Sequence, residues 1–157
     1  MKTGNAYWSV VHPIWETISI YDGVDRFLPE FAAAPTKARN LFAAHWCQSE
    51  ICNGGFYQFF DNSTGILAPE AVNAFRALGM PKLAEIVSNA MSWFGNEYPR
   101  ERQSRREALS LYASSHPEAR DPFRELDDAF YGLFESENEG FLRAADAYAI
   151  ATTNEQA

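Results

Sequence analysis

Apolar residues recur at intervals of three and four along most of the chain, and no convincing run alternates with a period of two. Spacing of three and four places side chains on one face of an α-helix, whereas a half-buried strand requires alternation. Proline or glycine separates most of these apolar stretches. The pattern therefore predicts an all-α fold, a single-domain irregular bundle of about seven to nine short helices over residues 1–157.

Proline marks the start of several predicted helices. Pro13, Pro35, Pro69, Pro81 and Pro122 stand at or next to the first turn of an apolar stripe, where the missing amide is not needed for an intrahelical hydrogen bond. We expect helices over residues 13–21, 24–33, 35–53, 68–79, 81–95, 100–112, 121–134 and 139–150.

The stretch from residue 50 to residue 65, EICNGGFYQFFDNSTG, departs from this regular pattern. Asn53 is followed by two glycines, which indicates a tight corner because these residues tolerate positive φ. Phe56, Phe59 and Phe60 then follow at helical spacing, so they should form one apolar anchor. We predict a helix that ends near Asn53, a Gly-Gly corner, a two-turn helix and a capped exit.

This stretch carries a long motif, ExxNGGFxQFFxNSxG. The motif resembles the signature of the bacterial DNA-mimic-protein-like family of unassigned function. The similarity continues through residues 75–80, 99–102 and 126–131. The motif positions are Glu50, Asn53, Gly54, Gly55, Phe56, Gln58, Phe59, Phe60, Asn62, Ser63 and Gly65.

The family is named after a member that acts as a DNA mimic, its members are all-helical, and few have a known activity. The resemblance therefore implies a protein partner, namely a DNA-binding protein whose DNA site would be blocked.

The charge of the chain is concentrated at one end. The formal net charge is −8, and residues 125–157 hold eight acidic residues and one basic residue, a local −7. Such a run either keeps the protein soluble or forms a negative face for a basic partner. The candidate acidic face consists of Glu125, Asp127, Asp128, Glu135, Glu137 and Glu139.

The sequence offers no catalytic or metal-binding arrangement. His12, His45 and His116 are scattered, and neither an HExxH pattern nor a Cys/His zinc spacing is present. His45 and Glu50 are five positions apart and do not share a helix face. We expect no catalytic residues, no cofactor and no metal, and we interpret His45 as a core or boundary histidine.

Polar residues around the Gly-Gly corner allow two interpretations. Glu50, Asn53, Gln58 and Asn62 could line a ligand site, or they could satisfy backbone groups that the corner leaves open. Buried amides without partners cost about 1–3 kcal/mol each, so the second interpretation is favoured.

Two further patterns limit the partners. The arginines of residues 100–106 are interleaved with glutamates, which predicts local ion pairs rather than direct nucleic-acid binding. No apolar run is long enough to span a membrane, and Cys47 and Cys52 form no disulfide framework. We expect a cytoplasmic protein without a membrane partner, and a homodimer is compatible with the sequence.

The sequence is compatible with three functions. The leading hypothesis is a non-enzymatic acidic protein-binding module that, by resemblance, mimics DNA and blocks a DNA-binding protein. An immunity-type protein that neutralises a toxin is the first alternative. A small-ligand binder or enzyme that uses the polar cluster between Glu50 and Asn62 is the second.

Overall fold

The computed structural model describes residues 2–152, and within that range the chain forms eight α-helices and two 3-10 helices without a strand. The predicted all-α class is thereby confirmed. The elements in order are α1 (Asn5–Trp15), α2 (Val24–Ala32), α3 (Thr36–Asp61), η1 (Ser63–Leu67), α4 (Ala68–Ala77), α5 (Pro81–Ser92), α6 (Arg102–Ser115), α7 (Arg124–Phe134), η2 (Glu137–Glu139) and α8 (Phe141–Ile150).

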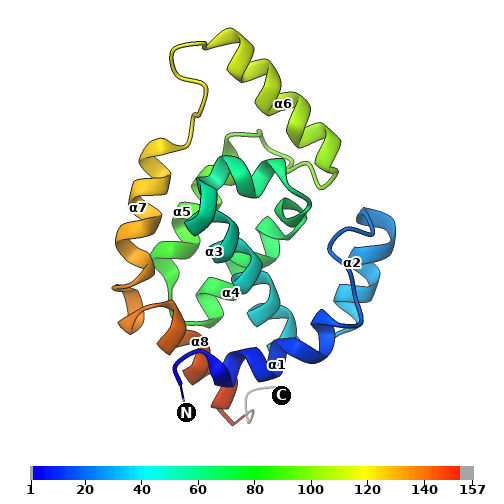
Figure 1. The fold of residues 1–157 in the computed structure, drawn as a ribbon, viewed down its shortest axis with the longest axis vertical. Coiled ribbons are helices and arrows are strands. Elements are labelled where there is room, and N and C mark those ends of the chain that lie inside the picture. The colour runs from blue at the N-terminus through cyan, green and yellow to red at the C-terminus, as the bar shows by residue number, and fades with distance from the viewer. Residues whose placement is uncertain (1, 153–157) are drawn as a thin grey trace.

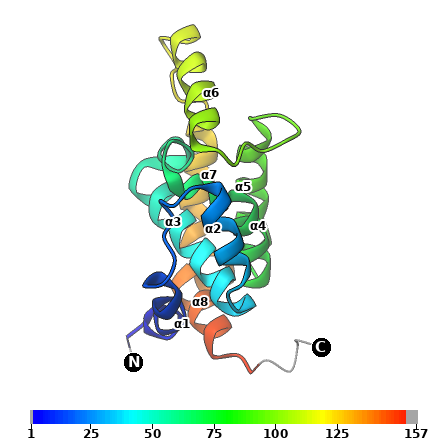
Figure 2. The same ribbon diagram turned by 90° about the vertical axis from the view of Figure 1, so that its right-hand side faces the viewer.

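Helix α3 lies at the centre of the molecule, and α1, α4, α6, α7 and α8 all contact it (Figure 1). Helix α6 projects at one end of the long axis, while α1 and α8 lie together at the opposite end, as two perpendicular views show (Figures 1 and 2). Helix α7 connects these two ends along one side of the molecule. The two halves of α3 therefore lie toward opposite ends of an elongated bundle.

The core around the second half of α3 is built largely from phenylalanine. Phe56, Phe59 and Phe60 are each 0% exposed, as their helical spacing predicts. The ring centroid of Phe60 lies 5.0 Å from that of Phe94 and 5.2 Å from that of Phe123. Aromatic rings bury large apolar areas and pair favourably at such distances. The apolar anchor expected in the motif is confirmed.

Two helical segments of α3 meet at a kink in the Gly-Gly corner, as the sequence predicts. Gly54 has φ −151° and ψ 19°, and Gly55 has φ 75° and ψ −178°. A Cβ atom at Gly55 would lie 2.6 Å from Oδ2 of Asp127 on α7. Positive φ and this close approach both require glycine. The positive φ that the Asn-Gly-Gly run allows is found at Gly55.

The first helix differs from the prediction. We expected it to begin at Pro13, but α1 runs from Asn5 to Trp15 and contains Pro13 in its last turn. Tyr7, Val11 and Ile14 form its buried stripe, and this stripe outweighs the hydrogen bond that proline cannot donate.

The carboxylate of Asp146 on α8 fixes the start of α1. It accepts hydrogen bonds from the amide of Gly4 at 2.5 Å and from that of Tyr7 at 3.0 Å. It therefore supplies the cap that the side chains at the beginning of α1 do not provide. The other helices begin and end within a few residues of the predicted positions.

Candidate functional site

The polar residues of the motif converge on the carboxylate of Glu50. Its Oε2 atom accepts hydrogen bonds from Gln58 Nε2 at 2.6 Å and from Asn62 Nδ2 at 3.1 Å. Its Oε1 atom accepts a hydrogen bond from the hydroxyl of Thr64 at 3.1 Å. Asn53 Nδ2 donates to Gln58 Oε1 at 3.2 Å and extends the cluster. These side chains join the two halves of α3 to η1.

The side chains of the cluster form no hydrogen bond with the backbone of the corner, so the favoured interpretation, that they satisfy open backbone groups, is wrong. The amide of Phe56, directly after the kink, donates instead to Asp127 Oδ1 at 2.8 Å. The four polar side chains bond to one another and to Thr64. Their role in the described structure is to hold the kinked helix and η1 together through side chains.

An open depression of about 550 Å³ lies beside this cluster and is lined by Trp46, Gln48, Ser49, Glu50, Cys52, Asn53 and Gln58. Glu50 already accepts three hydrogen bonds there, which leaves its carboxylate little capacity for a ligand. The depression is open to solvent, whereas small-molecule sites are usually enclosed and mostly apolar. The geometry gives little support to a ligand-binding or enzymatic role for the cluster.

Asp127 does not belong to the acidic face on which it was placed. Only 9% of the residue is exposed, and its carboxylate points to the kink of α3. Burial raises the pKa of Asp127 to about 6, although the hydrogen bond from the Phe56 amide lowers it in part. The physical reason is that the glycine corner leaves an amide without a helical partner, and Asp127 supplies the acceptor.

Glu137 also has a structural role. Its carboxylate accepts hydrogen bonds from the amides of Lys82 and Leu83, both at 2.8 Å. These amides belong to the first turn of α5, whose own N-cap residue, Met80, makes no side-chain cap hydrogen bond. Glu137 therefore caps α5 from the neighbouring η2 and is only partly exposed.

The other four acids of the candidate face are exposed: Glu125, Asp128, Glu135 and Glu139. Glu139 lies 3.9 Å from Arg143, a long and exposed pair. Within residues 2–152 the remaining three form no ion pair. Glu125, Asp128 and Glu135 therefore define the unpaired stripe of α7, named here the α7 stripe.

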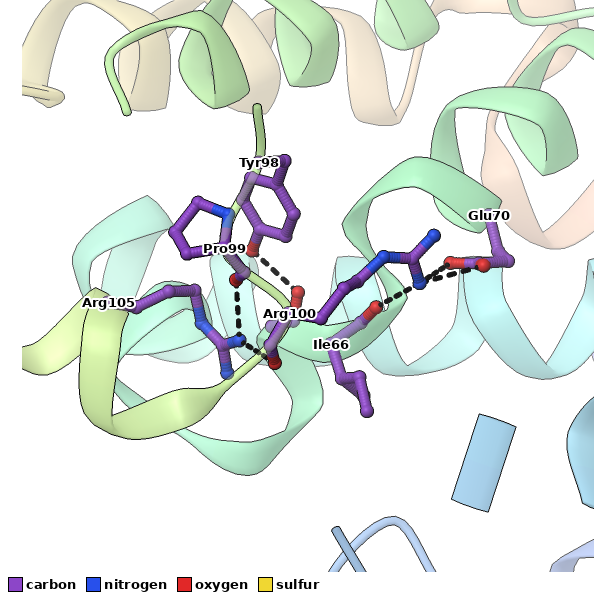
Figure 3. Close-up of polar contacts among 7 residues, drawn as sticks. Ile66, Glu70, Tyr98, Pro99, Arg100 and Arg105 are labelled. Carbon is purple, nitrogen blue, oxygen red and sulfur yellow. Dashed lines mark hydrogen bonds and ion pairs between the residues drawn. The ribbon is translucent and has the colours of Figure 1, made fainter. Parts of the chain in front are cut away.

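Arg105 is the principal residue that the sequence did not reveal. It is 0% exposed, and its guanidinium donates to four carbonyl oxygens, those of Phe60, Asn62, Pro99 and Arg100, at 2.6 to 3.1 Å. Figure 3 shows the bonds to Pro99 and Arg100. The available signal was its position four residues before Leu109, which places both on the inward face of α6.

The neighbouring arginines bind distant elements, so the predicted local ion pairs are wrong. Arg100 Nη1 donates to both carboxylate oxygens of Glu70 on α4, at 2.8 and 2.9 Å (Figure 3). Arg102 donates to the carbonyl of Asp61, and Arg106 lies 3.3 Å from the Asp61 carboxylate. The arginines thus attach α6 and the preceding loop to α3, η1 and α4.

His45 lies at the boundary of the core, where the sequence placed it. Its Nδ1 atom is 3.1 Å from the hydroxyl of Tyr7, and the rings of Trp8, Trp15 and Trp46 surround it. Burial lowers the pKa of His45 to about 4. Among the described residues no group of three His, Cys, Asp or Glu side chains is arranged to hold a metal ion.

None of the helices in the described range combines the length and the apolar character that crossing a membrane requires.

Comparison with known protein families gives one result: the family model described as DMP19-like protein matches residues 32–152, from the end of α2 to just beyond α8. No curated protein sequence and no solved structure matches the chain significantly.

Proposed function

The chain belongs to the DMP19-like protein family, and we propose that it is a non-enzymatic protein that docks onto a basic, DNA-binding partner through the α7 stripe. The observation that carries the proposal is the exposure of three unpaired carboxylates along α7 and its end. The family resemblance supplies the class of partner.

The spacing of these acids suits an extended basic surface. Glu125 and Asp128 are one helical turn apart, and Glu135 follows two turns after Asp128, so the stripe is about 15 Å long. Tyr131 lies between them with 42% of its surface exposed, and its hydroxyl donates to the carbonyl of Ile51. An ordered aromatic residue among the carboxylates offers contact area as well as charge.

The magnitude of the charge sets the expected binding mode. Duplex DNA carries one charge per about 1.7 Å, so the stripe reaches only about a third of that density. Electrostatic attraction of this size accelerates encounter and favours basic partners, but it is strongly screened by salt. We therefore expect a salt-sensitive association of modest affinity.

The distribution of positive charge supports the same face. The arginines of α6, Arg102, Arg105 and Arg106, lie in its first two turns and bond to the end of α3 and to the loop before α6 rather than to α7. Arg124 stands at the start of α7 and is the cation nearest in sequence to the stripe. The end of α7 near Glu135 is therefore the more negative part of the face.

The proposal is tested with proteins that have been eluted from a duplex-DNA column and passed over the immobilised chain. We expect capture at about 50 mM salt, loss of capture by about 0.3 M, and displacement by short duplex DNA. The triple variant Glu125→Lys, Asp128→Lys and Glu135→Lys should lose capture without loss of stability, because exposed carboxylates contribute little to folding.

The matched control reverses the same number of exposed acids elsewhere, with Glu16→Lys, Glu85→Lys and Glu97→Lys. It should retain most of the capture, because net charge alone does not define a face. Equal losses in both triple variants, or capture that duplex DNA cannot displace, would contradict the proposal.

A further inference from the structure

A second feature of the surface has the opposite charge. A cavity of about 250 Å³ lies where the start of α2, the start of η1 and the start of α6 meet. Its lining includes Gly23, Ser63 and three arginines, Arg100, Arg102 and Arg105. We name it the arginine cavity. It is formed by segments that are far apart in the sequence, and the acids of the α7 stripe do not line it.

The positive charge of this cavity is poorly balanced by the protein. Arg105 is fully buried and has only carbonyl oxygens as partners, without a carboxylate within the described residues. Burial lowers the pKa of Arg105, and the charges of Arg102 and Arg100 lower it further, while the charge of Glu101 opposes this shift. A buried cation without a counter-ion is unfavourable, and a bound anion would relieve that cost.

Arg100 and Arg102 are only partly engaged. Arg100 uses Nη1 for Glu70 and for the carbonyl of Ile66, and Arg102 uses Nε for the carbonyl of Asp61. Within residues 2–152, Nη2 of Arg100 and both Nη atoms of Arg102 donate no hydrogen bond. Each guanidinium carries five N–H donors, so donors remain for a ligand.

Two helix starts add to the positive potential. α2 begins after Gly23 and α6 begins after Glu101, and neither has a side-chain cap. Their first amides therefore keep donors that no side-chain cap satisfies, and the helix dipole favours negative charge there. Ser63 also lines the cavity, and a serine hydroxyl can donate a further hydrogen bond.

Carboxylates near the cavity oppose the binding of an anion. Glu101 is exposed and lines the cavity, and Asp25 lies in the first turn of α2. Glu70 neutralises part of the charge of Arg100 from the far side. Asp25 does not line the cavity, so three lining guanidinium groups against Glu101 and Glu70 leave a formal excess of one positive charge, in a chain whose net charge is −8.

We propose that the arginine cavity binds a phosphate group, either free or carried as the monoester of a small metabolite. Its volume corresponds to several water molecules of about 30 Å³ each, which accommodates a tetrahedral oxyanion and a few attached atoms. Planar guanidinium forks and helix starts are the groups that proteins use for phosphate. The proposal is independent of the α7 stripe.

The test is an NMR titration of the full chain with inorganic phosphate at pH 7, with sodium chloride adjusted to constant ionic strength. We expect saturable amide shifts around Gly23, Ser63 and Arg102, with a dissociation constant on the order of 1 mM. A parallel titration with glycerol 3-phosphate separates the two sources, because tighter binding of the monoester identifies a metabolite rather than the free ion.

Arg102→Gln should weaken phosphate binding about tenfold, since it removes a charge-assisted donor. Arg106→Gln is the matched control: it removes the same charge one turn further along α6, outside the cavity, and should change binding less than about twofold. Both arginines are exposed, so both variants should fold.

Two results would overturn the proposal. One is the absence of saturable shifts in the wild type up to about 20 mM phosphate, which corresponds to affinity too weak for a site. The other is an equal effect of the two glutamine variants, which would show diffuse attraction to α6 rather than a site. Loss of capture by the basic partner leaves this inference unaffected, because the two experiments probe different surfaces.

Discussion

Asp127 on α7 accepts a 2.8 Å hydrogen bond from the amide of Phe56 on α3, across 71 positions of sequence. The amide needs this acceptor because Gly54 and Gly55 leave the helical conformation directly before it. An unpaired amide in the core would cost about 1–3 kcal/mol. One side chain therefore both stabilises the kink of the central helix and positions α7 against it.

The pH dependence of folding follows from this contact. The pKa of Asp127 is about 6 in the folded protein, against about 3.9 in an unfolded chain. The folded state therefore holds the proton more tightly, and this group contributes stability that is complete below pH 4 and is lost as the pH rises through about 6. The free-energy difference between wild type and Asp127→Asn should fall over this range. Urea denaturation of both proteins from pH 4 to pH 7 measures it, and a constant difference would contradict the assigned pKa.

Gly55→Ala should destabilise the fold by at least about 1 kcal/mol, because φ is positive and the new Cβ meets the Asp127 carboxylate. Gly132→Ala on α7 is the control: nothing lies within 4 Å of its Cβ position, so alanine should be neutral or stabilising by about 0.5–1 kcal/mol. Chemical denaturation midpoints test the pair, and equal behaviour of the two variants would show that the kink does not require glycine.

Arg105→Lys should cost about 3 kcal/mol or more. A lysine ammonium cannot reproduce the planar fork that reaches four carbonyl oxygens, so several buried acceptors would lose their partners. The same substitution at the exposed Arg106 should cost less than about 0.5 kcal/mol. Thermal and urea unfolding measure both, and a mild effect at Arg105 would mean that water replaces the lost donors.

Phe59→Ala should destabilise the protein by about 3–5 kcal/mol, because the ring is 0% exposed and its removal leaves a cavity. Phe59→Leu should cost clearly less, since most of the volume remains. Denaturant midpoints provide the measurement. An unchanged midpoint for the alanine variant would show that this part of the core collapses without loss.

Local rules predicted much of the fold. Phe56, Phe59 and Phe60 lie in the core because their helical spacing places all three rings on the same face of the helix. Gly55 adopts positive φ because glycine, which has no Cβ atom, tolerates this conformation better than other residues. Prolines at helix starts gave most boundaries, but Pro13 was misleading, since it is tolerated near the end of a helix whose stripe begins at Tyr7.

The errors at the candidate site share one physical cause. Asp127 and Glu137 lie in an acidic stretch typical of a solvated face, yet each carboxylate accepts backbone hydrogen bonds from a helix distant in the sequence. Arg105 lies in a charged segment typical of exposed ion pairs, yet its partners are carbonyl oxygens at the end of α3 and in the loop before α6. Tertiary hydrogen bonds of this kind leave no periodic trace in a single sequence.

The bond between Asp146 and the first turn of α1 has a consequence for synthesis on the ribosome. It joins positions 142 and 139 residues apart, so α1 emerges long before the helix that caps it. Contacts of such long range form late and slow the search for the native state. Until α8 has left the exit tunnel, Tyr7 lacks its contact with the ring of Phe141, and α1 can pack only against the helices that precede α8.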